Sequence, residues 1–231
     1  MDGTAMYDTL ITSESKSTAD VVFDRLHADI VSLEILPGAK ISEAEIARRF
    51  GVSRQPVRDA FRRLHNLDLI EIRPQRATVV RRFSLAEIEH TRFVRLAVEL
   101  EVMTRACQVW DPSYDDRLAK NLTEQSAALA AGETERFHEL DYEFHRLICT
   151  AAGLPMAFET INRCKRKVAR LCVLSLSDDE NVAEILDDHL AIADALRRRA
   201  TQECRSLMRE HTRRLSPTIA KIHETHAEYF Q

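Results

Sequence analysis

Three histidines and one aspartate in the second half of the chain have types and spacings that suit a metal centre. Asp141 and His145 are four residues apart in a segment of helical pattern, so they occupy neighbouring positions on one helix face. His189 and His211 each lie eleven residues from Ala200, where two further helices are expected to turn back on each other. At about 1.5 Å per residue, both imidazoles then lie about 16 Å from the turn, at the same level. This donor set suits a divalent ion, with zinc as first choice and nickel or manganese as alternatives.

Two other interpretations of these four residues stay open. The metal ion can be purely structural, with no role in sensing. A metal held by three histidines and a carboxylate can also activate water for hydrolysis. The hydrolase is disfavoured because no HExxH segment or other evident general base accompanies the four residues. We therefore expect no enzymatic activity.

A second group of residues, between Ile41 and Val80, has the chemistry of a DNA-reading surface. Arg54, Arg58 and Arg62 recur at four-residue intervals, so their guanidinium groups share one face of a helix. Arginines on such a face bind guanine edges and phosphate oxygens. The alternative, that they only solvate the helix, is disfavoured because turn, cap and charge signals coincide here. The predicted DNA-contacting set comprises Ser53, Arg54, Gln55, Arg58, Arg62 and Arg76.

The elements that position this set are predicted to form a winged helix-turn-helix domain over residues 18–83, preceded by a loose arm over residues 1–17. Apolar residues at three- and four-residue steps predict a first helix over residues 18–36, which Pro37 and Gly38 end. Cap and turn signals delimit two further helices, the third running to about residue 66: Ser42 with Glu45 as a capping box, Gly51 at the turn, and Ser53 as the cap of the third helix.

The wing is predicted as a two-stranded hairpin over residues 69–73 and 78–82. Gln75 and Arg76 would lie at its tip, where they can reach a phosphate or the minor groove. A helix, a short glycine turn and a second helix with a basic outer face match the geometry of a groove-reading pair.

Residues 84–231 are predicted to form an antiparallel bundle of six helices, because helical patterns alternate with short breaks. Ser84 and Glu87 form another capping box at its start. The short connections imply that successive helices are mostly antiparallel neighbours. The expected helices span residues 84–110, up to 131, 133–152, 156–176, 179–199 and 201–229. The fold class is therefore mainly α.

Composition and charge agree with a two-domain globular protein. Hydrophobic residues make up 45% of the 231 residues, and no apolar run approaches the ~20 residues of a membrane span. The net charge is −4, yet residues 19–83 carry twelve Lys and Arg against nine Asp and Glu, a local excess of +3. Five scattered cysteines indicate buried thiols in a reducing cytoplasm. The basic runs at residues 165–167 and 197–199 are interpreted as helix ends or flanks.

The chain resembles the GntR family of bacterial regulators. LPGAKISEAEIARRFGVSRQPVRDAFRRL followed by LIEIRPQRATVV is similar to its DNA-binding domain, in which the equivalents of Arg54 and Arg58 contact operator bases and phosphates. Two departures concern Ala44, where many members have an arginine, and the wing tip at residues 74–77, which lacks the usual glycine.

Residues 84–229 resemble the FCD ligand-binding domain of the FadR branch, and six helices are typical of its VanR-type subgroup. The resemblance rests on four motifs: FVRLAVELE, DYEFH, DDH and MREH. In metal-binding members the equivalents of Asp141, His145, His189 and His211 hold a divalent ion. The resemblance also implies that a small carboxylate metabolite binds beside the metal, with Arg95 meeting a carboxylate group, although Arg95 can equally pair with Glu99 one turn away.

These observations together predict a cytoplasmic, homodimeric transcription factor. Two copies would place two recognition helices about 34 Å apart on a pseudo-palindromic DNA operator. Binding of a small carboxylate effector at the metal would change that placement, and repression relieved by the effector is favoured over activation.

Overall fold

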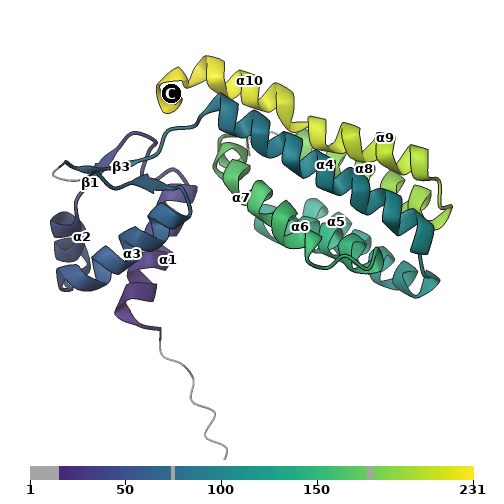
Figure 1. The fold of residues 1–231 in the computed structure, drawn as a ribbon, viewed down its shortest axis with the longest axis horizontal. Coiled ribbons are helices and arrows are strands. Elements are labelled where there is room, and N and C mark those ends of the chain that lie inside the picture. Colours follow the sequence, from purple (N-terminus) through teal and green to yellow (C-terminus); the bar gives the residue numbers. More distant parts are fainter. Residues whose placement is uncertain (1–15, 74–75, 176–178) are drawn as a thin grey trace, which may run out of the picture. The chain divides into compact units, whose positions relative to one another are not determined.

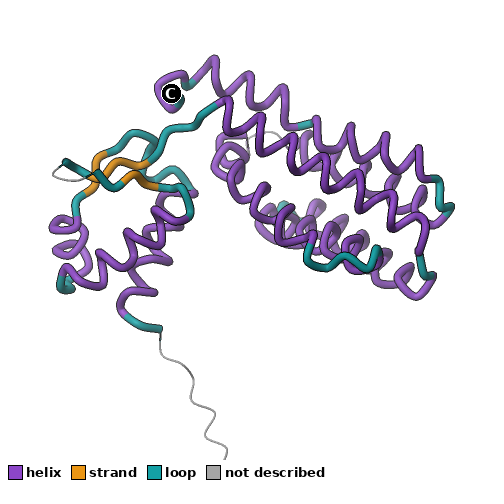
Figure 2. The backbone as a smooth tube through the Cα atoms, in the orientation of Figure 1, coloured by secondary structure: helices purple, strands orange, loops and turns teal. Residues whose placement is uncertain are grey.

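The computed structural model describes residues 16–73, 76–175 and 179–231, which form two compact units (Figure 1). The first unit ends at Arg81, and the second runs from Arg82 to Gln231 and also takes in Val31–Leu33. Both units are mainly helical, as the sequence predicts, and the strands of the described chain all belong to the first (Figure 2). None of the described helices is long and apolar enough to cross a membrane.

Three helices form the body of the N-terminal unit: α1 (Thr18–Val31), α2 (Glu43–Phe50) and α3 (Arg54–Asn66). The Ser42 hydroxyl accepts a hydrogen bond from the Glu45 amide at 3.1 Å, as the predicted cap requires. Gly51 ends α2 with φ of 64°, a left-handed conformation that glycine adopts without steric cost. The apolar faces of the three helices meet in one core, which includes Val22, Leu26, Ile30, Val57, Phe61 and Leu64.

The first helix is five residues shorter than the predicted span of residues 18–36. It ends at Val31, and Leu33 takes a left-handed φ of 64°. The Ile35 amide donates a hydrogen bond to the Asp29 carbonyl at 2.9 Å, which closes the end of the helix. The helix therefore ends through local backbone geometry before Pro37 can act as a breaker.

A small antiparallel sheet covers this body, with strand order β1-β3-β2: β1 (Lys40–Ile41), β2 (Ile70–Glu71) and β3 (Thr78–Val80). The hairpin of β2 and β3 is the predicted wing, although its strands are shorter than expected. Strand β1, which was not predicted, pairs with β3 through Lys40 and Val79. The predicted tip residue Gln75 lies outside the described residues.

The C-terminal unit is a helical bundle in which α4 packs against α7 and α9, α5 packs against α6 and α8, and α8 packs against α9 (Figure 1). Its helices are α4 (Leu85–Val109), α5 (Asp115–Ala130), α6 (Thr134–Ala151), α7 (Ala157–Ser175), α8 (Asp179–Arg197), α9 (Thr201–Arg213) and α10 (Leu215–Thr225), with short 3-10 turns at Pro112–Tyr114 and Ala227–Tyr229. The Ser84 hydroxyl accepts from the Glu87 amide at the start of α4, as predicted. Large apolar side chains such as Met103, Leu118, Phe137 and Phe144 fill the core.

The single last helix expected over residues 201–229 is divided into α9 and α10 at Arg214. Pro217 explains the break, because it has no amide hydrogen to donate to the carbonyl of Arg213 four residues earlier. After α10 the chain end pairs with the start of this unit, where the Phe83 amide donates to the Tyr229 carbonyl at 2.8 Å. The break places the C-terminal residues beside the segment that leads into α4.

Candidate metal centre and DNA-reading surface

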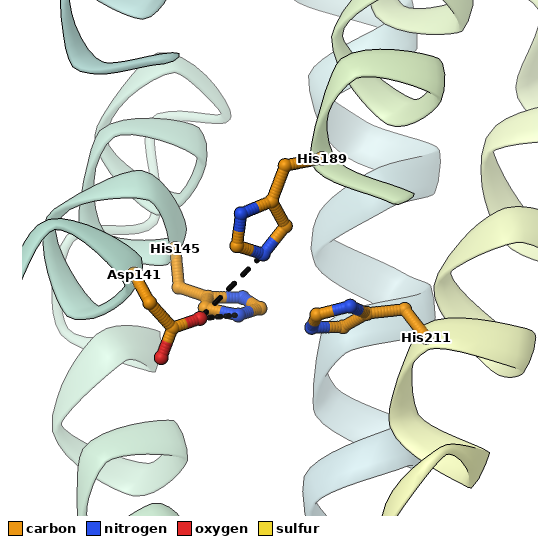
Figure 3. A group of neighbouring side chains, drawn as sticks. All are labelled: Asp141, His145, His189 and His211. Atoms are coloured by element: carbon orange, nitrogen blue, oxygen red, sulfur yellow. Dashed lines mark ion pairs between the residues drawn. The ribbon is translucent and has the colours of Figure 1, made fainter. Parts of the chain in front are cut away.

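The four residues predicted as metal ligands meet inside the helical bundle (Figure 3). Helix α6 contributes Asp141 and His145, α8 contributes His189, and α9 contributes His211. One donor atom from each lies within 4.8 Å of the others, and all four side chains are buried. The structure therefore brings together the four residues whose helical spacing and expected hairpin predicted that they lie close to one another.

The donor atoms converge on a small space. Asp141 Oδ1 lies 3.4 Å from His145 Nε2 and 3.5 Å from His189 Nε2 (Figure 3). The ring of His211 faces both other imidazoles, with centroids 5.3 Å from His145 and 4.8 Å from His189. Within the described chain, Nε2 of His145 and Nε2 of His189 are buried and have no hydrogen-bond partner. Because a buried nitrogen without a partner is costly, this arrangement fits a bound cation that would use these lone pairs.

The outward nitrogens of His145 and His189 have acceptors that fix these two rings. His145 Nδ1 lies 3.1 Å from a carboxylate oxygen of Glu99, and His189 Nδ1 lies 2.8 Å from the side-chain oxygen of Gln125. A carboxylate or amide oxygen can only accept, so each of these Nδ1 atoms donates a proton and Nε2 is the nitrogen left to face the centre. His211 Nδ1 lies 3.4 Å from Asp188. Such outer partners are typical of metal-binding histidines.

A lysine that the sequence analysis interpreted as flanking a helix is part of the centre. Lys165 on α7 is buried, and its Nζ forms an ion pair with Asp141 Oδ2, the carboxylate oxygen that faces away from the imidazoles. The expectation that the run at residues 165–167 ends or flanks a helix is wrong, because all three residues lie within α7, where Lys165 is buried and Arg166 and Lys167 are exposed. A basic run gives no sign of which of its members points inward.

Arg95, the predicted contact for an effector carboxylate, lies on α4 beside the centre. Its Nε donates to Glu99 Oε1 at 3.2 Å, and its side chain is 15% exposed. The pairing with Glu99 that the sequence allowed is therefore present. Since the same Glu99 oxygen contacts His145, Arg95 is linked to the centre through a single carboxylate.

Burial and neighbouring charges together lower the pKa values of Asp141, His189 and His211. Burial alone would raise the pKa of Asp141, but Lys165 and the neighbouring imidazoles outweigh it and hold that pKa well below its usual value. Burial lowers the pKa of His189 strongly and also lowers that of His211. The carboxylate is therefore ionised and these two imidazoles are neutral near pH 7, which is the state that binds a metal ion.

Most of the predicted DNA-reading residues lie on the outer face of α3, and Ser53 directly precedes this helix. Ser53, Arg54, Gln55, Arg58 and Arg62 are all exposed. Ser53 occupies the N-cap position of α3 but its side chain makes no capping hydrogen bond, contrary to the expectation. Arg58 Nη2 lies 3.1 Å from Glu43 Oε2 at the start of α2. Arg76 is also exposed, next to the undescribed tip of the wing.

Comparisons with known proteins identify the families to which the two units are similar. Residues 18–80 match the family described as bacterial regulatory proteins, gntR family, and residues 91–214 match the FCD domain. The chain belongs to the GntR family of bacterial regulators. It is 34% identical to the HTH-type transcriptional repressor RspR of Escherichia coli K12, over 90% of this chain and 92% of that protein. It is also 29% identical to an uncharacterised HTH-type transcriptional regulator from Streptomyces ambofaciens, over 90% of this chain and 88% of that one.

The solved structure of E. coli McbR/YncC has the same fold, with a TM-score of 0.67 at 19% identity over 91% of this chain and 99% of that one. The GntR protein described here is therefore a DNA-binding transcriptional regulator and not an enzyme. This assignment removes the hydrolase interpretation of the buried aspartate and histidines.

Proposed function

We propose that this GntR regulator is a repressor whose binding to DNA is controlled by a small carboxylate metabolite bound at a metal ion in the C-terminal unit. The observation that supports this most directly is the convergence of four buried donor atoms within 4.8 Å of one another, with Nε2 of His145 and His189 lacking other partners among the described residues. Asp141, His145, His189 and His211 would hold the ion. Three imidazoles and one carboxylate favour zinc, with nickel or manganese also suited.

The ion would supply positive charge and open coordination positions for a carboxylate. Four protein ligands leave one or two positions open in five- or six-coordinate geometry. Arg95 lies beside the centre on α4 and would meet a carboxylate group of the effector. The name of RspR, a repressor, supports repression as the sign of regulation.

DNA binding would use the exposed face of α3 in the major groove. Ser53, Arg54, Gln55, Arg58 and Arg62 would contact bases and phosphates, and Arg76 of the wing would reach a phosphate or the minor groove. A homodimer would place two such helices on a pseudo-palindromic operator in the cytoplasm. The effector can release DNA only if it binds the DNA-incompetent arrangement more tightly, and a preference of about 100-fold corresponds to about 2.7 kcal/mol.

The test uses the full-length protein loaded with Co²⁺, whose visible spectrum reports its ligands, and an operator selected from random duplexes. Titration with small organic acids should change the Co²⁺ spectrum and release the operator over the same concentration range. If no acid changes the spectrum although the ion is bound stoichiometrically, the metal is structural and sensing at this site is refuted.

A matched pair of variants tests whether the bound Co²⁺ is held by the four donor residues. His189→Ala should lose most of the bound Co²⁺, because it removes one of four ligands. His90→Ala, at an exposed position on α4, should keep the wild-type metal content. Full Co²⁺ occupancy in His189→Ala would exclude that residue from the site.

A further inference from the structure

Among the residues that the structure describes, each carboxylate that touches the four donor residues is paired with a cation. Asp141 pairs with Lys165, and Glu99, which contacts His145, pairs with Arg95. Asp188, which contacts His211, pairs with Arg214, whose Nη2 donates to Asp188 Oδ1 at 2.7 Å. Arg214 also reaches Glu184, but that carboxylate is more than half exposed and solvent screens it.

These pairs leave the surroundings of the donor atoms without net charge. Each of the three carboxylates is joined to one of the three cations in an ion pair, so their formal charges cancel. A divalent ion at the centre would therefore add two positive charges with no surplus of negative charge nearby. An uncompensated charge in a buried site is strongly disfavoured.

Lys165 has the largest effect on this balance because it contacts a ligand directly. Its Nζ holds Asp141 Oδ2, while Oδ1 of the same carboxylate faces the imidazole nitrogens. The contact therefore has two consequences. It turns one oxygen of Asp141 toward the ion, and it offsets the only negative charge among the four ligands.

We propose that Lys165 makes metal retention in this centre conditional on a co-bound anion, and that the matching effector class is a small dicarboxylate. The dicarboxylate would supply the two negative charges that the ion needs, so ion and acid would bind together more tightly than either alone. Lys165 is a positioning residue in this scheme. The inference rests on the proposed metal site and adds to it the charge of the effector and the residue that enforces it.

The experiment measures the affinity of the full-length protein for Co²⁺ by its visible spectrum, without an acid, with acetate, and with succinate. Free Co²⁺ is corrected for binding to each acid. A unit charge within about 4–6 Å shifts the equilibrium of a neighbouring charge by about tenfold or more. We therefore expect succinate to raise the Co²⁺ affinity of the wild type by about tenfold or more, and acetate to raise it less.

Three variants separate the charge of Lys165 from its packing. Lys165→Met removes the charge and should bind Co²⁺ without an acid at least about tenfold more tightly than the wild type, with a smaller response to succinate. Lys165→Gln can still donate to Asp141 and should behave in the same way if Met disturbs folding. Arg166→Met removes an exposed charge from the next position and should match the wild type.

The outcomes distinguish this inference from the proposed function. If the wild type binds no Co²⁺ under any condition, the metal site itself is refuted, and the inference with it. If the wild type binds Co²⁺ equally well with and without succinate, both the conditional retention and the dicarboxylate class are overturned, while the metal site stands. If both uncharged variants respond to succinate as the wild type does, only the role of Lys165 is overturned.

Discussion

A chain of hydrogen bonds sets the orientation and the proton position of the His189 imidazole in the absence of a metal ion. Asn121 donates to the Leu140 carbonyl at 3.0 Å, so its side-chain oxygen is left to accept from Gln125 Nε2 at 2.7 Å. That bond orients Gln125 with its own oxygen toward His189 Nδ1. The ring of Phe144 stacks on His189, with centroids 4.0 Å apart. Both proton position and ring orientation are therefore set by the protein.

Replacing Gln125 by leucine should lower metal affinity by about 10- to 100-fold, the usual effect of losing an outer partner. Leucine has a similar volume but cannot accept the proton of His189 Nδ1, so the ring loses its fixed tautomer. Competition with a chromophoric chelator measures the change. Ser126→Ala, at the exposed neighbouring position, serves as the control and should leave the affinity unchanged. Equal affinities for both variants would contradict the role given to Gln125.

Neutral buried histidines also predict a pH dependence for the metal-free protein. Burial lowers the pKa of His189 and of His211 below the ordinary histidine value of about 6.5. The unfolded chain then binds more protons than the folded one just below pH 6.5, so stability is fully present above that pH and falls as the pH drops toward the folded pKa values. The carboxylates of the centre have lowered pKa values and lose their contribution only under more acidic conditions.

Thermal unfolding of the metal-free protein between about pH 5 and pH 8 should therefore show a melting temperature that falls toward acid. His189→Gln should flatten this dependence, whereas His90→Gln, at an exposed position, should keep it. A dependence of equal slope in both variants would locate the effect elsewhere.

The sequence predicted the four donor residues because their spacing is a property of helices and of one hairpin. It missed Gln125 as an outer partner and misinterpreted Lys165, because their roles depend on which way two other helices face. A glutamine carries no sequence signal for binding a histidine, and a lysine within a basic run is typical of a solvated surface. Packing among α5, α6, α7 and α8 determines which side of each helix points toward the centre. Residue spacing alone does not determine this packing.

At the scale of elements, the two helix starts in the N-terminal unit differ although both carry a serine. Ser42 accepts a hydrogen bond from the Glu45 amide, whereas Ser53 makes no such bond at the start of α3. Ser42→Ala should therefore destabilise this unit by about 1 kcal/mol. Ser53→Ala should leave stability nearly unchanged and weaken DNA binding, as expected of a residue that contacts DNA. Chemical denaturation of both variants checks this, and equal losses of stability would contradict it.

The basic face of α3 leads to a prediction about recognition. Arg58→Ala should weaken operator binding by about tenfold to a hundredfold and reduce the preference for operator over random DNA, if Arg58 contacts a base. In the unbound protein Arg58 is paired with Glu43, so Glu43→Gln should not weaken binding. Fluorescence anisotropy with operator and random duplexes measures both effects. Unchanged discrimination in Arg58→Ala would assign Arg58 to phosphates.

Element boundaries were predicted well where a single local signal decides them. Ser42, Gly51 and Ser84 delimit helices as expected because caps and left-handed turns are local. The early end of α1 at Val31 and the extra strand β1 were missed, since a left-handed leucine is uncommon and a two-residue strand forms only through pairing with β3. Pro217 does carry a local signal for the break before α10, because proline lacks the amide hydrogen that a continuous helix needs there.

At the scale of the whole molecule, an effector bound in the C-terminal unit must act through the arrangement of two DNA-binding units. Because the effector would bind in the C-terminal unit, the fold of a single winged helix-turn-helix unit does not by itself respond to the effector. The proposed homodimer would connect effector binding to DNA binding, because two recognition helices bind a palindromic site together only when their separation matches that of the half-sites. Regulation then depends on the geometry of a pair.

This dependence predicts how affinity varies with operator spacing. Adding five base pairs between the half-sites turns one of them to the opposite face of the duplex, so affinity should fall to about that of a single half-site. The effector should weaken binding to the intact operator and have little effect on a single half-site, since only the intact site requires both units. Anisotropy titrations on the three duplexes, with sedimentation to confirm two chains per operator, measure these effects. Equal affinity for the intact and the five-pair-extended operator would show that each chain binds on its own, and the effector would then have to act within one DNA-binding unit.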